Sequence, residues 1–195
     1  NLGRALVAKG KLEEAAGALR EVIKSDPMSA SAHCELGTIL ARRGNIPAAL
    51  SEFETAIQLQ PDLQDAHYRR GLTQWHLGWY QEAERSLTRA VELDEKHFDS
   101  RLYLGLSRQK LGNFESSIDP LEDAIKLDEK SAEAHLALGK AYMAGKDFAK
   151  AKEEFTLAIE LSPGSTEPEK NLADARAALG ERANAATSSD VATIK

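Results

Sequence analysis

Three histidines, His33, His67 and His135, are the residues of this chain best suited to bind a metal. They lie at multiples of 34 residues from one another, and Arg101 occupies the remaining position of that series. Equivalent positions on neighbouring helices lie about 8–10 Å apart, whereas a zinc–nitrogen bond measures about 2.0–2.1 Å. The spacing therefore predicts packing histidines rather than a shared zinc site.

Other chemistry that can be recognised from sequence is not found. Cys34 is the only cysteine, so an intramolecular disulfide is excluded, and a small packing residue is favoured over a reactive thiol. The sequence contains no G-x-S-x-G, H-E-x-x-H, C-x-x-C or dinucleotide glycine motif. The nearest approach to a phosphate loop, from Gly139 to Lys146, has one residue too many between its glycines. We therefore predict a non-catalytic protein without cofactor or metal.

Internal repetition is the dominant feature of the chain. Glycine recurs at the same spacing as the histidines, at Gly3, Gly37, Gly71, Gly105 and Gly139. Small residues hold a second register, at Ala15, Ala49, Ala83, Ser117 and Ala151. Large apolar residues follow four positions later, at Leu19, Phe53, Leu87, Leu121 and Phe155. Small residues let two helices approach closely, and we expect the large apolar residue to fill the space between them.

Each unit predicts two helices. In residues 132–165 the apolar positions recur every three or four residues on both sides of a break at Gly145–Asp147. Glycines mark the turn inside each unit, at Gly44, Gly78, Gly112 and Gly145, and prolines mark the turn between units, at Pro27, Pro61 and Pro163.

The unit His135-x2-Leu138-Gly139-x2-Tyr142, then Ala151-x3-Phe155, then Pro163, resembles the tetratricopeptide repeat family. The resemblance covers about residues 1–165. It implies an all-α, right-handed helical-repeat solenoid of antiparallel helix pairs, with about five 34-residue repeats and a C-terminal capping helix. It also implies the role of a protein-binding scaffold.

The predicted domains follow the repeat. The array spans 1–165, with a partial first repeat and four full ones at 1–29, 30–63, 64–97, 98–131 and 132–165. Residues 166–180 predict the capping helix, with Thr166 as its N-cap and Gly180 at its end. We expect a disordered tail over 181–195, and an N-terminal hairpin, containing Leu2 and Leu6, that frays first.

Polar residues replace apolar packing residues in the central repeats, at Arg70, Gln74, Arg101 and Arg108. An arginine can lay its stem on apolar surface while its head meets water or a carboxylate. Pro120 interrupts the second helix of the fourth unit and predicts a tolerated kink or a hinge.

The resemblance places the second face of each first helix in a concave groove. Apolar, aromatic and basic residues on that face form the predicted peptide-binding groove: Arg42, Tyr68, Arg69, Leu72, Trp75, Leu102, Tyr103, Leu106, Lys110, Leu136, Lys140 and Met143. The basic members, Arg42, Arg69, Lys110 and Lys140, have no evident structural partner in the sequence. We expect Trp75 to be the strongest anchor.

The predicted partner is a protein or peptide with acidic and bulky apolar residues. The formal net charge of −6 argues against nucleic acid, and no apolar run reaches the length that membrane insertion needs. We expect a soluble protein, with the cytoplasm the favoured compartment, that can form a homo-oligomer through an open N-terminal end.

Two alternatives remain open from sequence. The array can be an interaction or self-assembly domain of a larger protein, or it can serve a catalytic domain that lies upstream of Asn1.

Overall fold

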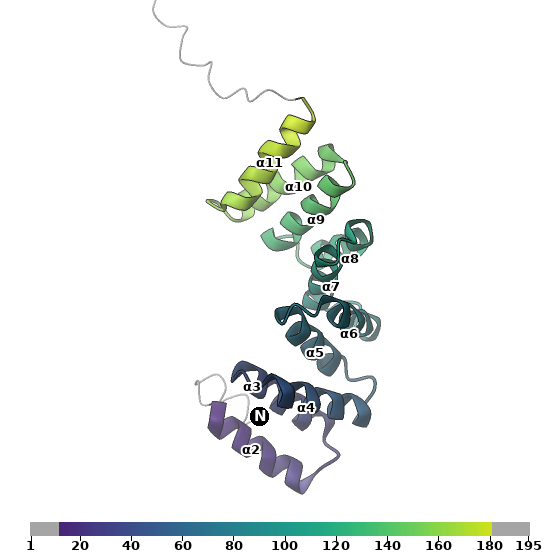
Figure 1. Cartoon of the computed structure of the whole chain (residues 1–195), viewed down its shortest axis with the longest axis vertical. Helices are drawn as coiled ribbons and strands as arrows, with labels where there is room; N and C mark the ends of the chain where they lie inside the picture. The colour runs from purple at the N-terminus through teal and green to yellow at the C-terminus, as the bar shows by residue number, and fades with distance from the viewer. Residues whose placement is uncertain (1–11, 181–195) are drawn as a thin grey trace, which may run out of the picture. The chain divides into compact units, whose positions relative to one another are not determined.

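The computed structural model describes residues 12–180, which form ten α-helices and contain no β-strand in that range. The all-α prediction is confirmed, and the helices are the antiparallel pairs of a helical-repeat fold (Figure 1). The predictions for Gly3, for fraying at Leu2 and Leu6, and for a disordered tail over 181–195 lie outside the described residues.

The described residues divide into two compact units, at the boundary between Asn113 and Phe114. The boundary falls inside the predicted fourth repeat, between its two helices. The first unit contains α2 (Leu12–Ser25), α3 (Ala30–Arg42), α4 (Ile46–Leu59), α5 (Gln64–His76), α6 (Tyr80–Leu93) and α7 (Phe98–Lys110). The second contains α8 (Phe114–Leu127), α9 (Ala132–Ala144), α10 (Phe148–Leu161) and α11 (Thr166–Ala178).

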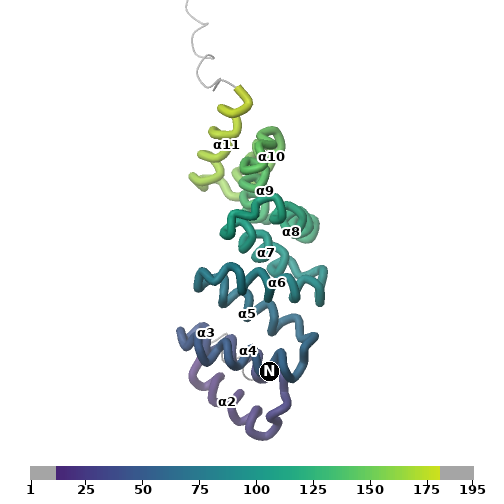
Figure 2. Tube along the Cα trace, turned by 45° about the vertical axis from the view of Figure 1, so that its right-hand side comes forward, coloured from purple at the N-terminus to yellow at the C-terminus, as the bar shows by residue number. Residues whose placement is uncertain are grey.

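Within the first unit α3 packs on α4 and α5 packs on α6, side by side in both views (Figures 1 and 2). The helix α2, the second helix of the partial first repeat, packs on α3. Within the second unit α9 packs on both α8 and α10. The helix α8 continues through Pro120, whose side chain is buried.

The glycine register brings the two helices of a pair together. A methyl group added at Gly37 would lie 2.8 Å from the ring of Phe53, and one added at Gly139 would lie 2.5 Å from the ring of Phe155. Both phenylalanines are almost fully buried, at 1% and 0% exposure. The expectation that a large apolar residue fills the space beside a small one is therefore confirmed.

The turn inside each pair uses a left-handed residue. Gly44, Gly78 and Gly112 have φ between 77° and 82°, a conformation that costs glycine little. In the last pair Gly145 has an ordinary helical conformation, and the non-glycine Lys146 takes the left-handed one with φ of 62°. Gly145 lies in this turn, as predicted, and the left-handed residue is its neighbour Lys146.

One hydrogen bond closes the turn between successive pairs. His33 Nε2 donates to Pro27 O at 3.2 Å, His67 Nε2 to Pro61 O at 3.0 Å and His135 Nε2 to Glu129 O at 3.1 Å. Arg101 occupies the same register, and its Nε donates to Glu95 O at 2.7 Å. Each side chain thus satisfies the carbonyl six residues before it, so these residues act as structural clamps.

The capping helix is α11, which packs on α10 and α9. Its buried residues Leu172 and Ala175 belong to the face predicted for it. The predicted N-cap is wrong: Thr166 is the first helical residue, and Ser165 stands at the cap with its hydroxyl 3.0 Å from that of Ser162. Gly180 follows the helix with φ of 72°, so the predicted end is confirmed.

We expect Gly139→Ala to lower the stability of the chain by about 1–3 kcal/mol, because the new methyl group must displace the buried Phe155 ring. Gly17→Ala is the matched control. A methyl group at Gly17 meets no atom within 4 Å, and alanine gains about 0.5–1 kcal/mol over glycine inside a helix. Thermal unfolding followed by circular dichroism should show the two variants shifting in opposite directions. Equal shifts would contradict the close approach at Gly139.

Candidate functional site

The first helices of the repeats carry the predicted groove residues. In the first unit, Arg42 and Lys110 are exposed. Six further residues of this unit are half-buried: Tyr68, Arg69, Leu72, Trp75, Tyr103 and Leu106. We call these eight residues the first-helix face. Leu102 does not belong to it, because its side chain is only 3% exposed and packs in the interior.

Aromatic rings fill the middle of this face. The ring of Trp75 meets that of Tyr103 edge to face at a centroid distance of 5.1 Å, and Tyr80 lies 6.3 Å away. Trp75 and Tyr103 also pack against the buried cluster that contains Leu87 and Leu104. The indole Nε1 of Trp75 is buried and has no hydrogen-bond partner in the described part of the chain. Trp75 therefore contributes to the fold as well as to the surface.

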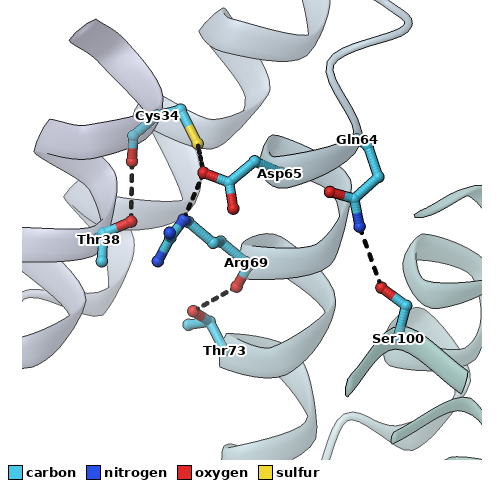
Figure 3. Close-up of polar contacts among 7 residues, drawn as sticks. All are labelled: Cys34, Thr38, Gln64, Asp65, Arg69, Thr73 and Ser100. Carbon is cyan, nitrogen blue, oxygen red and sulfur yellow. Dashed lines mark hydrogen bonds and ion pairs between the residues drawn. The ribbon is translucent and has the colours of Figure 1, made fainter. Parts of the chain in front are cut away.

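A polar array fixes Arg69, as Figure 3 shows. Asp65 Oδ2 accepts a hydrogen bond from Arg69 Nε at 2.8 Å, one helical turn away, and a weak one from Cys34 Sγ at 3.8 Å. The array joins α5 to α3. The expectation that Arg69 has no structural partner is therefore wrong.

The same array explains the state of the single cysteine. Burial raises the pKa of the Cys34 thiol to about 12, and the neighbouring Asp65 carboxylate adds to the shift. At neutral pH the thiol stays protonated and donates to Asp65. Since the thiolate is the nucleophile, Cys34 is a packing residue with little reactivity.

The other predicted cations fall into two groups. Lys140 Nζ lies 2.5 Å from Glu167 Oε1, so it ties α9 to the capping helix and is not a free charge. By contrast, no ion pair joins Arg42 or Lys110 to a carboxylate within residues 12–180. In the second unit, Leu136 and Met143 are half-buried on α9.

Two of the central arginines, Arg70 and Arg108, have carboxylate partners inside the first unit. Arg70 pairs with Glu54 at 2.6 Å, joining α5 to α4, and Arg108 pairs with Glu84 at 2.9 Å, joining α7 to α6. The hydroxyl of Ser86 accepts from Arg70 and donates to Gln74. The expected meeting of an arginine head with a carboxylate is confirmed, and these residues join neighbouring helices.

A pocket of about 400 Å³ opens between α3, α4 and α5 in the first unit. We call it the α3–α5 pocket. Its lining is mainly apolar, and its charged or ionisable members are all basic. The lining residues are Thr38, Ala41, Arg42, Ile46, Phe53, Arg69, Leu72, Thr73, His76 and Leu77.

Comparison with the next layer of the same unit explains the pocket. Ala41 stands in the register of Trp75, and Arg69 stands in the register of Tyr103, each one repeat earlier in the chain. Between α5 and α7 the Trp75 and Tyr103 rings fill the space. Between α3 and α5 a methyl group replaces the indole, so an open volume remains. The signal was present in the sequence as an alanine in the tryptophan register.

Trp79 is a second feature that sequence analysis missed. It is 48% exposed and stands at the N-cap of α6, without a side-chain cap hydrogen bond. Its register holds Asn45, Asn113 and Asp147 in the other pairs, which are ordinary N-cap residues. Trp79 follows Leu77, a lining residue of the α3–α5 pocket, in the same turn.

Neither a metal cluster nor a membrane span is present in the described part of the chain. No group of three or more His, Cys, Asp or Glu side chains in residues 12–180 is placed to hold a metal ion. None of the helices there is long and apolar enough to cross a membrane.

The chain belongs to the tetratricopeptide repeat family, whose model matches residues 1–63, 34–98 and 102–166. No curated protein sequence is similar enough to count as a relative.

Solved structures share the fold. The chain is 21% identical to YrrB, described as a TPR protein with an unusual peptide-binding site, with a TM-score of 0.82 over 86% of this chain and 87% of that one. It is 24% identical to MamA, with a TM-score of 0.74 over 89% of this chain and 98% of that one. It is 18% identical to pilF of Pseudomonas aeruginosa, with a TM-score of 0.80 over 93% of this chain and 82% of that one.

Native Cys34 should react with a disulfide reagent such as DTNB at pH 8 at least about 100-fold more slowly than the chain unfolded in guanidinium chloride, because the raised pKa leaves little thiolate. The matched control combines Cys34→Ser with Ser31→Cys, which places a thiol at an exposed position one turn earlier on α3. The control should react at a similar rate in both states. Fast labelling of native Cys34 would contradict its assignment as a buried packing residue.

Proposed function

We propose that this chain is a non-catalytic scaffold that binds a peptide or protein segment along the first-helix face of the first unit. The observation that carries the proposal is the combination on this face of half-buried apolar side chains with two exposed cations, Arg42 and Lys110, that no carboxylate of residues 12–180 neutralises. Aromatic and apolar residues beside charge are typical of interaction surfaces.

Family membership supports this proposal, because tetratricopeptide repeat proteins generally bind other proteins. YrrB, which shares the fold, is described as having a peptide-binding site. The side chains of the first-helix face support the position proposed for the site in this chain.

The partner we propose carries acidic and bulky apolar residues. Arg42 and Lys110 lie at the C-terminal ends of α3 and α7, and they can attract a carboxylate in a chain that is acidic overall. Leu72 and Leu106 between them offer apolar contact area. On α9 of the second unit, Leu136 and Met143 offer similar contacts, and Lys140 can contribute once its bond to Glu167 opens.

The chemistry of the ionisable side chains supports a non-catalytic role. Catalysis of group transfer needs a nucleophile, a base and an orienting group that converge on one point. Here burial raises the pKa of the one thiol, and His33, His67 and His135 donate to backbone carbonyls. These side chains therefore stabilise the fold.

Selection of random peptides on the immobilised chain should enrich sequences with acidic and bulky apolar residues. Lys110→Glu should weaken the selected peptides at least about fivefold at low salt, and less at high salt, because an exposed charge acts through screened attraction. Fluorescence polarisation with labelled peptides measures both effects.

Arg85→Glu is the matched control, because Arg85 is an exposed cation on the second helix α6. Its affinity for the selected peptides should stay within about twofold of the unmodified chain. Equal losses in the two variants, or enrichment of basic peptides, would contradict the proposed face. Trp75→Ala is a poor test, since the ring also supports the fold.

A further inference from the structure

The α3–α5 pocket has an equivalent in the next repeat, where a side chain of the protein itself occupies the space. One layer further along the first unit, the corresponding space is filled by the ring of Trp75, which packs edge to face on Tyr103 at 5.1 Å. At the pocket, Ala41 replaces that tryptophan and Thr38 stands in the register of Leu72. The missing volume thus corresponds to an aromatic or large aliphatic side chain.

The lining gives the pocket its selectivity. Phe53, at 1% exposure, and the half-buried Leu72 and Ile46 supply apolar contacts. The ionisable lining residues are Arg42, Arg69 and His76, and none of the described acidic residues lines the pocket. Arg69 is held by Asp65, so its charge is largely balanced. The exposed Arg42 is therefore the lining cation available to an incoming anion.

We infer that the α3–α5 pocket accepts one aromatic or large aliphatic side chain from a partner segment, and that Arg42 pairs with a carboxylate next to that side chain. This inference rests on the proposed function and narrows it to one pocket and one pairing. An apolar group fills the space that Trp75 fills in the next layer, and an adjacent acid meets the Arg42 guanidinium. The pairing of Arg42 with a planar carboxylate adds orientation to the apolar contact.

The structure also indicates how the surface continues beyond the pocket. Leu77, which lines it, is 37% exposed, and Trp79 in the same turn is 48% exposed. A segment anchored in the pocket can lay further apolar residues on this turn. A tryptophan at an N-cap cannot make the capping hydrogen bond that asparagine or aspartate can make. Contact with a partner would explain why a tryptophan stands at this position.

The first test uses 3-indolepropionate as the probe, because it combines an aromatic ring with a carboxylate. Titrated into the full ¹⁵N-labelled chain, it should shift the amide signals of Thr38, Ala41, Leu72 and Thr73, with a Kd on the order of 1 mM for a ligand of this size. Indole without the carboxylate should bind the same place at least about fivefold more weakly.

Three variants and one control test the assignment. Ala41→Trp fills the pocket as Trp75 fills the next layer, and it should abolish binding of the probe while keeping or raising the thermal midpoint. If Ala41→Trp does not fold, Thr38→Leu fills part of the same volume and should weaken binding at least about fivefold. Arg42→Gln should reduce 3-indolepropionate to the affinity of indole and leave indole unchanged. Arg85→Gln, a charge removal on α6, should change neither.

The outcomes separate this inference from the proposed function. If the selected peptides bind the unmodified chain and Ala41→Trp with equal affinity, the pocket is not their binding site. That result would overturn the inference about the pocket and leave the proposed scaffold role unaffected. Probe binding at the pocket with no peptide selected would support the pocket and count against the scaffold role.

Other occupants of the pocket would also overturn the inference. A dimer in sedimentation that Ala41→Trp converts to a monomer would identify a second copy as the occupant. Shifts of the amides of residues 181–195 in the same variant would identify the C-terminal segment of this chain. Absence of any localised shift up to about 10 mM probe, ten times the expected Kd, would leave no ligand site at the pocket.

Discussion

The close approach of two helices at a glycine is the constraint on which the other features of the fold depend. At Gly37, Gly71 and Gly139 an added methyl group would collide with Phe53, Leu87 and Phe155, respectively, at 2.5–2.8 Å. In these three helix pairs the contact sets the spacing and aligns one face of the first helix with its partner. The opposite face is then left to meet either the next repeat or a ligand.

Polar contacts secure the layers that these helix pairs form. His33, His67, Arg101 and His135 each close the preceding turn through the same carbonyl bond. Ion pairs of Arg70 with Glu54 and of Arg108 with Glu84 join successive helices in the centre of the first unit. Half-buried arginines can serve this purpose because their stems pack on apolar surface while their heads stay hydrogen-bonded.

Differences between repeats, rather than the repeat itself, create the candidate site. A repeated fold gives every first helix a similar face, so function must come from positions where one layer departs from the others. Ala41 occupies the repeat position that Trp75 holds in the next repeat, and this leaves a pocket. Trp79 occupies an N-cap position that is asparagine or aspartate in the other pairs, and its indole is exposed. Arg42 supplies a charge that no carboxylate of residues 12–180 neutralises. These departures lie together in sequence around the turns that follow α3 and α5.

The helices, their pairing and the turns could all be predicted from the amino-acid sequence, because the repeat period and the helical spacing of apolar residues are local properties of the chain. The capping helix and the packing role of the histidines followed from the same patterns. Which side chains are available to a partner emerged from the folded structure alone. Arg69 and Lys140 carry charges that Asp65 and Glu167 balance, and Leu102 is buried. Such outcomes depend on distances between helices, which the sequence does not state. The replacement of tryptophan by Ala41 can be seen in the sequence, but only the packing of α3, α4 and α5 shows that an open volume remains there.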